Sequence, residues 1–192
     1  MQVRTATKMS RFLPRAVVAH VLLALALMTL AVSAWALDPG PDGWYHTGDG
    51  VRVKKVIFNF DVYAISHDMK ALPPAKSKQA VIDMDTDKRF TWRMLRDVEQ
   101  EKIQNAVKEA FAMNGYTDQS KIGPYVAAFS GDRQKGQVIT IKYDSTAKAV
   151  SVTVQGGGTA TIPGIEFMNA VWSIWFGKID QPSLGDQLIR NL

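Results

Sequence analysis

Few residues of this chain have the types and spacing that chemistry requires, and the histidines are the first to consider. Beyond the first 36 residues there are two, His46 and His67, and neither belongs to an H-x-x-x-H or H-x-E pattern that would favour a zinc site. The chain has no cysteine, which excludes a thiol nucleophile and thiolate metal ligands. We expect both histidines in loops, and His67 as a general base is the less favoured alternative. We therefore predict neither a bound metal nor a cofactor.

A phosphate-binding loop is not predicted either. The glycine triplet 156–158 is followed by threonine-rich, strand-like sequence rather than by a helix, so it is typical of a turn. Basic residues such as Arg89, Arg93 and Arg96 are scattered, which is typical of a solvated surface rather than of a binding stripe.

Alternating apolar residues predict the strands that must position any site. The stretch 51–65 alternates with a period of two, which predicts one long strand with Phe58 and Phe60 on its core face. A loop is expected over 67–78, where Pro73 and Pro74 interrupt the pattern. Further strands are predicted over 79–84, 90–95, 137–143, 149–155 and 159–162, the third and fourth forming a hairpin.

Apolar residues three and four apart predict the helices. Asp97 begins a capping box, so a helix is expected to start there and to end before Gly115. Further helices are predicted over 120–129, over 165–176, which is apolar on most of its surface, and after Ser183 as N-cap. This order of elements predicts an α+β domain, in which helices pack on one face of a large, mostly antiparallel sheet.

The first 36 residues form the clearest pattern in the chain. Four basic residues precede an apolar run from Ala16 to Trp35, and small residues occupy the outer positions of an A-x-A site at 34–36. This combination predicts a secretory signal peptide that is cleaved to leave a domain over 37–192 in the periplasm. An uncleaved segment over 16–37 would instead tether the same domain to the inner membrane, and both alternatives remain open.

The charge balance of the chain reflects this leader. The sequence has 23 lysines and arginines against 18 aspartates and glutamates, a formal charge of +5. Four of the basic residues lie in the leader, which has no acid, so the other 156 residues carry 19 basic against 18 acidic side chains. The basic isoelectric point therefore gives no support for nucleic-acid binding. A domain of this length can bury a sizeable core without disulfides.

Three local stretches, in this order and spacing, resemble the chalcone isomerase-like family in its bacterial exported form. They are Gly-Asp-Gly-Val-Arg at 48–52 with Asp-Val-Tyr at 61–63, Leu-Arg-Asp-Val at 95–98, and the helix 165–177 with Leu-Ile at 188–189. The resemblance covers nearly all of 43–192. It implies an open-faced sandwich, a large antiparallel sheet covered by helices, with a ligand cleft between them.

The resemblance implies two functions that share one arginine. Plant members of the family cyclise a chalcone into a flavanone, and an arginine and polar side chains hold the phenolate and the developing enolate. Related members without this chemistry bind fatty acids, and the same arginine pairs with the carboxylate. The G-x-G-x-R pattern places that arginine at Arg52. A guanidinium can hold either anion with two parallel hydrogen bonds.

The positions of the family's catalytic hydroxyls are largely apolar in this chain. One threonine position is Phe58, a second is Ile174, and the tyrosine position falls on or near Val98. An asparagine of the family's long helix aligns with Asn105, and Tyr63 lies where its hydroxyl could enter the cleft. A cleft that keeps the arginine but replaces hydroxyls by Phe and Ile suits an acyl tail better than a polyphenol.

We therefore predict a non-catalytic domain that binds a small amphipathic, fatty-acid-like acid, with Arg52 at its anionic head. The other residues predicted to line the site are Phe58, Phe60, Tyr63, Asn105 and Ile174. The alternative is an isomerase, an intramolecular lyase, in which Arg52 stabilises an oxyanion. A structural protein of the cell envelope is a third possibility. Trp172 and Trp175 lie three apart on one predicted helix face, and we expect both in the core.

Overall fold

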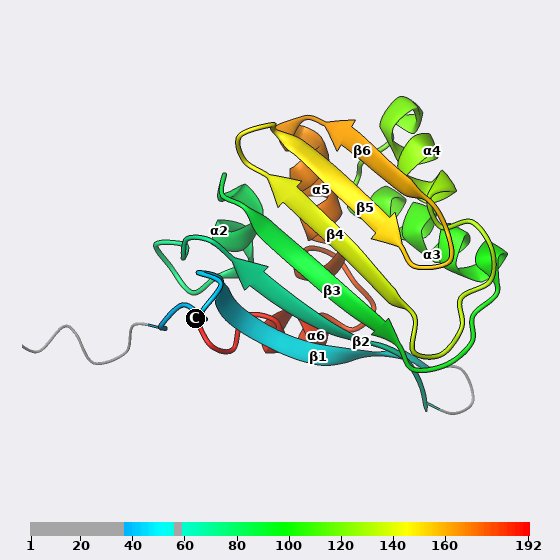
Figure 1. Ribbon diagram of the computed structural model, residues 1–192, viewed down its shortest axis with the longest axis horizontal. Helices are drawn as coiled ribbons and strands as arrows, with labels where there is room; N and C mark the ends of the chain where they lie inside the picture. The colour runs from blue at the N-terminus through cyan, green and yellow to red at the C-terminus, as the bar shows by residue number, and fades with distance from the viewer. Residues whose placement is uncertain (1–36, 56–58) are drawn as a thin grey trace, which may run out of the picture. The chain divides into compact units, whose positions relative to one another are not determined.

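Six antiparallel strands form one sheet, in the order in which they occur along the chain (Figure 1). They belong to a computed structural model that describes residues 37–55 and 59–192. The strands are β1 (Tyr45–Lys55), β2 (Asn59–Met69), β3 (Lys88–Met94), β4 (Val138–Asp144), β5 (Ala149–Val154) and β6 (Thr159–Pro163). Each strand pairs with the next, so the sheet is a simple meander.

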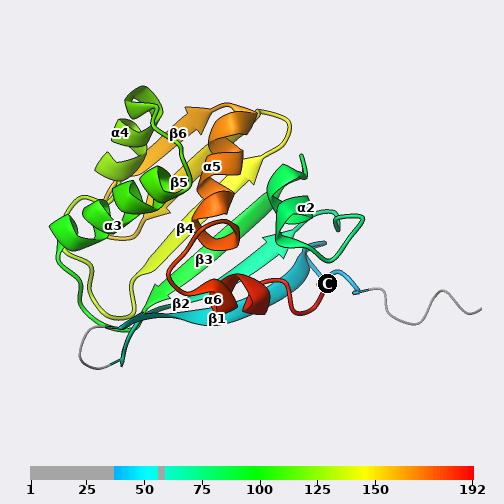
Figure 2. The ribbon, with the colours of Figure 1, turned by 180° about the vertical axis from the view of Figure 1, so that it is seen from behind.

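Helices cover one face of this sheet, as the view from behind shows (Figure 2). The described residues form the helices α2 (Lys78–Asp83), α3 (Gln100–Met113), α4 (Gln119–Ala127), α5 (Ile165–Phe176) and α6 (Pro182–Gln187). Within this unit α5 crosses the middle of the sheet, α4 lies beside β6, and α6 lies beside β1. The predicted α+β arrangement is confirmed. None of these helices is both long and apolar enough to span a membrane.

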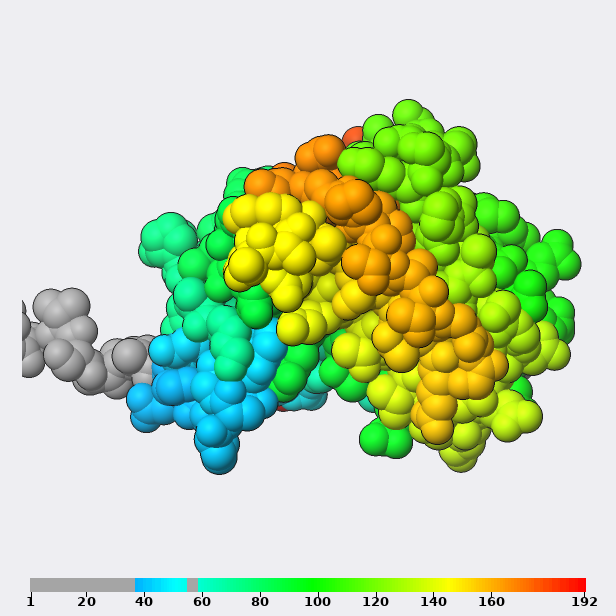
Figure 3. All heavy atoms as spheres, turned by 45° about the horizontal axis from the view of Figure 1, so that its top comes forward, coloured from blue at the N-terminus to red at the C-terminus, as the bar shows by residue number. Residues whose placement is uncertain are grey.

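The centre of the core is α5, which has the bounds predicted for it. Phe90 of β3 contacts three of its aromatic rings, with centroid distances of 5.1 Å to Trp172, 4.5 Å to Trp175 and 5.7 Å to Phe176. Trp172 and Trp175 are buried, as predicted. Because each large apolar side chain contributes about 1.5–3 kcal/mol when fully buried, this cluster is a major part of the stabilisation. The space-filling view shows the face of the domain on which β5 and β6, in yellow and orange, lie at the surface (Figure 3).

The stretch 51–65 is not one strand, and this prediction was wrong. It spans the end of β1 and the start of β2, which pair with each other. The residues between them, 56–58, contain no glycine, proline or aspartate, so the sequence carried no turn signal. The predicted faces were also wrong, because Ile65 and Met69 of β2 are buried whereas Phe60 is 39% exposed. Phe58 and the leader lie outside the described residues.

The segment predicted as a strand over 79–84 is the short helix α2. At its start, Ser77 Oγ accepts a hydrogen bond from Ala80 N at 3.1 Å. At its end, Nζ of the buried Lys88 donates to three main-chain carbonyls at 2.7–2.9 Å, those of Val81, Ile82 and Met84. A short apolar run in a sequence does not distinguish a strand from a helix. Here the side chains of Ser77 and Lys88 bind the main-chain groups left unpaired at the two ends of the helix, and these hydrogen bonds favour the helix.

The prediction of loops for both histidines was wrong, because His46 lies in β1 and His67 lies in β2. His67 is fully buried. Its Nδ1 donates to Thr47 Oγ1 at 2.6 Å, because that hydroxyl itself donates to Leu188 O at 2.8 Å. Its Nε2 accepts from Trp172 Nε1 at 2.9 Å. Both ring nitrogens of the neutral imidazole therefore form hydrogen bonds. Burial, followed by the charge of Lys88, lowers the pKa of His67 well below 6.5.

Because His67 is buried in its neutral form, we predict that the folded domain loses stability in mild acid. The unfolded chain takes up a proton at this residue as the pH falls below 6.5, whereas the folded chain does so only at lower pH. The free energy of unfolding of the wild type should therefore fall by up to about 2 kcal/mol between about pH 7 and pH 5. Urea unfolding at several pH values measures this slope. In His67→Gln the slope should be much smaller, and an equal slope would contradict the assignment.

Candidate functional site

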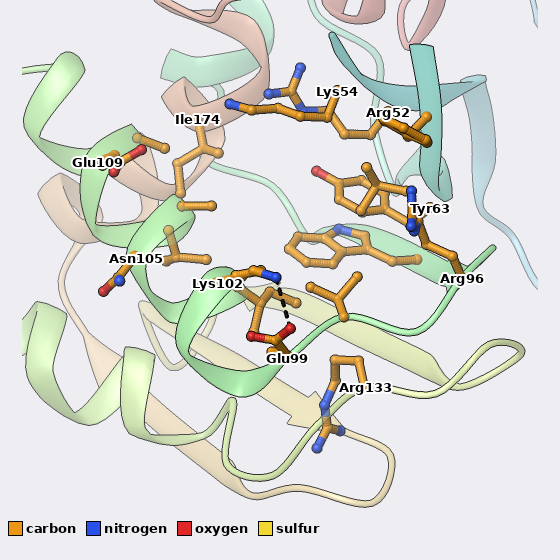
Figure 4. A pocket seen from close by; sticks show the side chains of 18 of the residues that line it. Arg52, Lys54, Tyr63, Arg96, Glu99, Lys102, Asn105, Glu109, Arg133 and Ile174 are labelled. Atoms are coloured by element: carbon orange, nitrogen blue, oxygen red, sulfur yellow. Dashed lines mark hydrogen bonds and ion pairs between the residues drawn. The ribbon is translucent and has the colours of Figure 1, made fainter. Parts of the chain in front are cut away.

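A cleft of about 930 Å³ lies between α3 and the end of the sheet where β1, β2 and β3 meet the end of α5 (Figure 4). This volume is within the range of small-molecule sites. Most of its deep lining is aromatic or aliphatic, and charged side chains from β1, α3 and the loop after α5 surround it. Among the described residues, no three histidine or acidic side chains form a group that could hold a metal ion.

An aromatic stack forms part of the cleft lining. The rings of Tyr63 and Trp92 are stacked at 4.6 Å with their planes 6° apart, and Trp175 packs edge-on against Trp92 at 5.2 Å. Trp175 Nε1 donates to the hydroxyl of Tyr63 at 3.1 Å. Burial raises the pKa of Tyr63, against the hydrogen bond from Trp175, so the hydroxyl stays protonated. Having accepted one hydrogen bond, this hydroxyl keeps its own proton to donate.

A β-bulge explains why residues of opposite parity in β2 both line the cleft. Arg52 of β1 pairs with Tyr63, but the next residue of β1 pairs with Asp61, so Val62 is an extra residue in β2. An extra residue shifts the alternation of side chains by one position. Phe60 and Tyr63 therefore both line the cleft.

Arg52 lines the cleft from β1, and Lys54 lies beside it on the same strand (Figure 4). The Nη2 atom of Arg52 donates to Asp180 Oδ1 at 2.5 Å, and Nη1 donates to Gln181 Oε1 at 3.2 Å. Lys54 Nζ lies 3.7 Å from the other carboxylate oxygen of Asp180. The Arg52 side chain is 17% exposed. The guanidinium therefore lies at the cleft but is already paired with a carboxylate of the chain itself.

The loop after α5, residues 178–181, is attached to the walls on both sides of the cleft. Gln181 pairs with the main chain of β1, accepting from Val53 N at 2.8 Å and donating to Val51 O at 2.9 Å. At the end of α3, Asn114 accepts from Lys178 N at 2.7 Å and donates to Lys178 O at 3.0 Å. These bonds fix the loop between β1 and α3.

The helix α3, which forms one wall, begins later than predicted. Its first amide, Gln100 N, donates to Asp132 Oδ1 at 2.9 Å, whereas Asp97 accepts from Lys135 N at 2.8 Å. The prediction that Asp97 caps this helix was therefore wrong, because a residue distant in sequence satisfies the helix terminus. The segment that carries Asp132 is fixed by the buried Arg133, which donates to four main-chain carbonyls: those of Ser130, Gly131, Gln155 and Gly156.

Five of the six residues predicted to bind a ligand line this cleft. They are Arg52, Phe60, Tyr63, Asn105 and Ile174, and the sixth, Phe58, lies outside the described residues. Asn105 is exposed on α3, and Ile174 is 7% exposed on α5. Phe60 carries the guanidinium of Arg96 over its ring, 4.8 Å from the centroid. Their roles in binding remain predictions.

Sequence reasoning missed two features of the cleft. Trp92 lines it but was not among the residues predicted to do so. Nothing in the sequence identified Asp180 as the partner of Arg52, since the two residues are far apart along the chain. His67, the less favoured candidate for a general base, does not line the cleft formed by the described residues.

The open antiparallel sheet, the helices on one of its faces and the cleft between them define an open-faced α+β fold. The model of the chalcone isomerase-like family matches residues 46–188. The chain therefore belongs to the chalcone isomerase-like family, as its sequence motifs predicted.

A similar fold occurs in the crystal structure of a fatty-acid binding protein from Arabidopsis thaliana. The TM-score is 0.63 with 15% sequence identity, over 81% of this chain and 91% of the plant chain. At this level of identity the similarity shows the shared fold alone. A comparison with curated proteins found no significant match.

The side chain of Gln181 is expected to stabilise the fold measurably. In Gln181→Ala, Val53 N and Val51 O lose their hydrogen bonds, and the free energy of unfolding should fall by about 1–2 kcal/mol. Chemical denaturation measures this difference. Gln134→Ala is the matched control, because Gln134 is exposed and its side chain forms no hydrogen bond with the described residues. Equal free energies of unfolding in the two variants would contradict a stabilising role for the hydrogen bonds of Gln181.

Proposed function

We propose that this chain is an exported, non-catalytic protein that binds a small amphipathic acid such as a fatty acid. Arg52 holds the carboxylate head, and the apolar lining of the cleft holds the tail. The observation that carries this proposal is the position of Arg52 at a ligand-sized cleft whose deep lining is aromatic and aliphatic. The fold of a fatty-acid binding protein is similar, which supports the same class of ligand.

Two donor side chains lie at the end of the cleft where the head group is proposed to bind. Arg52 and Tyr63 are opposite each other on neighbouring strands. Opposite residues on one face of an antiparallel pair have Cβ atoms about 5 Å apart, so a guanidinium and a protonated hydroxyl can reach one carboxylate. The ammonium of Lys54 lies on the same strand and adds positive charge.

The apolar lining supplies most of the binding free energy in this proposal. Trp92, Ile174 and Trp175 are nearly fully buried residues that line the cleft. Each methylene moved from water into such surroundings contributes about 0.8 kcal/mol, whereas one charged hydrogen bond contributes about 1.5–3 kcal/mol. The tail therefore sets the affinity, and the head group sets the orientation.

The replaced hydroxyls support binding rather than catalysis. Ile174 and Val98, which occupy positions of catalytic hydroxyls in the family resemblance, both line the cleft with apolar side chains. Without these groups, Tyr63 carries the only side-chain hydroxyl among the described residues that line the cleft.

The alternative is an isomerase of the chalcone–flavanone type. It is favoured by one observation, the protonated hydroxyl of Tyr63 next to Arg52, because two such donors could stabilise an oxyanion. Turnover of naringenin chalcone above the uncatalysed rate, abolished by substitution of Arg52, would favour this alternative over the binder.

Substitution of the arginine tests the proposed head-group contact. In Arg52→Ala, the affinity for dodecanoate measured by calorimetry should fall by about tenfold or more, because a charged hydrogen bond is lost. The affinity for dodecanol, which has the same tail and no charge, should change little. Arg93→Ala is the control, since Arg93 is an exposed arginine of β3 that does not line the cleft. Unchanged affinity of Arg52→Ala for dodecanoate would refute the contact.

The export proposal has its own test. The full chain, expressed in a Gram-negative host, should be recovered from the periplasm with Leu37 as its first residue, as intact-mass spectrometry would report. Ala36→Arg should block this cleavage, because a large charged side chain replaces a small residue of the A-x-A site. An uncleaved chain in the membrane fraction would favour the tethered alternative, and an uncleaved chain in the cytoplasm would contradict both.

A further inference from the structure

We propose that Asp180 determines the head-group specificity of the cleft, because it occupies the guanidinium of Arg52 and competes with the ligand's carboxylate. This inference rests on the proposed function and concerns a residue that neither the motifs nor the family resemblance indicated. Asp180 Oδ1 accepts from Arg52 Nη2 at 2.5 Å, a short and charge-assisted hydrogen bond. Asp180 itself lines the cleft.

The position of this carboxylate is set by the loop that carries it. The loop is attached to β1 through Gln181 and to α3 through Asn114. Since the side chain of Gln181, next to Asp180, and the main chain of Lys178, two residues before it, are both hydrogen-bonded to the walls, the backbone at Asp180 is held in position by the domain itself. Asp180 therefore acts as an internal anion at the place where the ligand's head group would bind.

A ligand's carboxylate must either displace Asp180 or share Arg52 with it. Sharing brings two negative charges close together, which is unfavourable unless a second cation is near. Lys54 provides that cation, with its Nζ 3.7 Å from Asp180 Oδ2. The side chain of Asp180 is 48% exposed, so a displaced carboxylate can be solvated or remain paired with Lys54. Displacement is thus possible but lowers the net affinity for an acid.

An uncharged head group does not meet this competition. An alcohol with the same tail can bind in the cleft without removing Asp180 from Arg52. Asp180 is therefore expected to reduce the preference of the cleft for acids over neutral amphiphiles. Removing its charge should increase that preference through a gain in affinity for the acid.

Asp180→Asn provides the test. The asparagine is nearly isosteric, and its amide oxygen can still accept from Arg52, so the loop should keep its position while the competing charge is lost. By calorimetry, the affinity for dodecanoate should rise by about tenfold, and the affinity for dodecanol should stay within about twofold of the wild type.

Glu109→Gln is the matched control. Glu109 is an exposed acid that lines the same cleft from α3 and is not a hydrogen-bond or ion-pair partner of Arg52. The substitution removes the same charge from the cleft without affecting the arginine. An equal increase in the affinity for dodecanoate in Glu109→Gln would show a general effect of charge in the cleft and overturn the specific role of Asp180.

A double variant separates this inference from the proposed function. If Asp180 acts through Arg52, adding Asp180→Asn to an Arg52→Gln protein should not increase the affinity for dodecanoate. A full increase in that background would overturn the inference. If the wild type binds dodecanoate and Asp180→Asn binds it no better, only the role of Asp180 fails. If neither protein binds dodecanoate, both proposals fail. Thermal unfolding of every variant confirms that each compared protein is folded.

Discussion

The burial of α5 against the sheet is the constraint on which both the fold and the cleft depend. Phe90 lies against Trp172, Trp175 and Phe176, and these aromatic contacts fix the rotation of the helix. The same rotation brings Trp175 Nε1 to the hydroxyl of Tyr63 and leaves Ile174 facing the cleft. Because α5 ends at the cleft, its position also determines where the loop 178–181 begins. Core packing and site geometry are therefore consequences of one interface.

The buried side chains of Lys88, Arg133 and His67 are all hydrogen-bonded within the domain. Lys88 donates to the last main-chain carbonyls of α2, and Arg133 donates to main-chain carbonyls near Ser130 and Gln155. His67 connects β1, through Thr47, with α5, through Trp172. A buried polar group is costly unless it is hydrogen-bonded, and each of these groups has its partners.

Under the proposed function, head-group recognition is an exchange of partners rather than the filling of an empty site. Arg52 is paired with Asp180, and Lys54 lies near enough to hold the same carboxylate. The net preference for an acid therefore depends on the difference between two ion pairs, which is smaller than either one alone.

The sequence by itself determined the features that depend on local pattern. The bounds of α5, the β4–β5 hairpin, the α+β class and the family followed from residue spacing and short motifs, and so did the positions of Arg52 and Tyr63 along the chain. The tertiary structure alone decided the hairpin within 51–65, the helical state of α2, the cap that Asp132 gives α3, the bulge at Val62 and the pairing of Arg52 with Asp180. The physical reason is common to these cases. Each depends on a hydrogen bond, ion pair or strand register that forms only when the chain folds, and no local periodicity records such a partner.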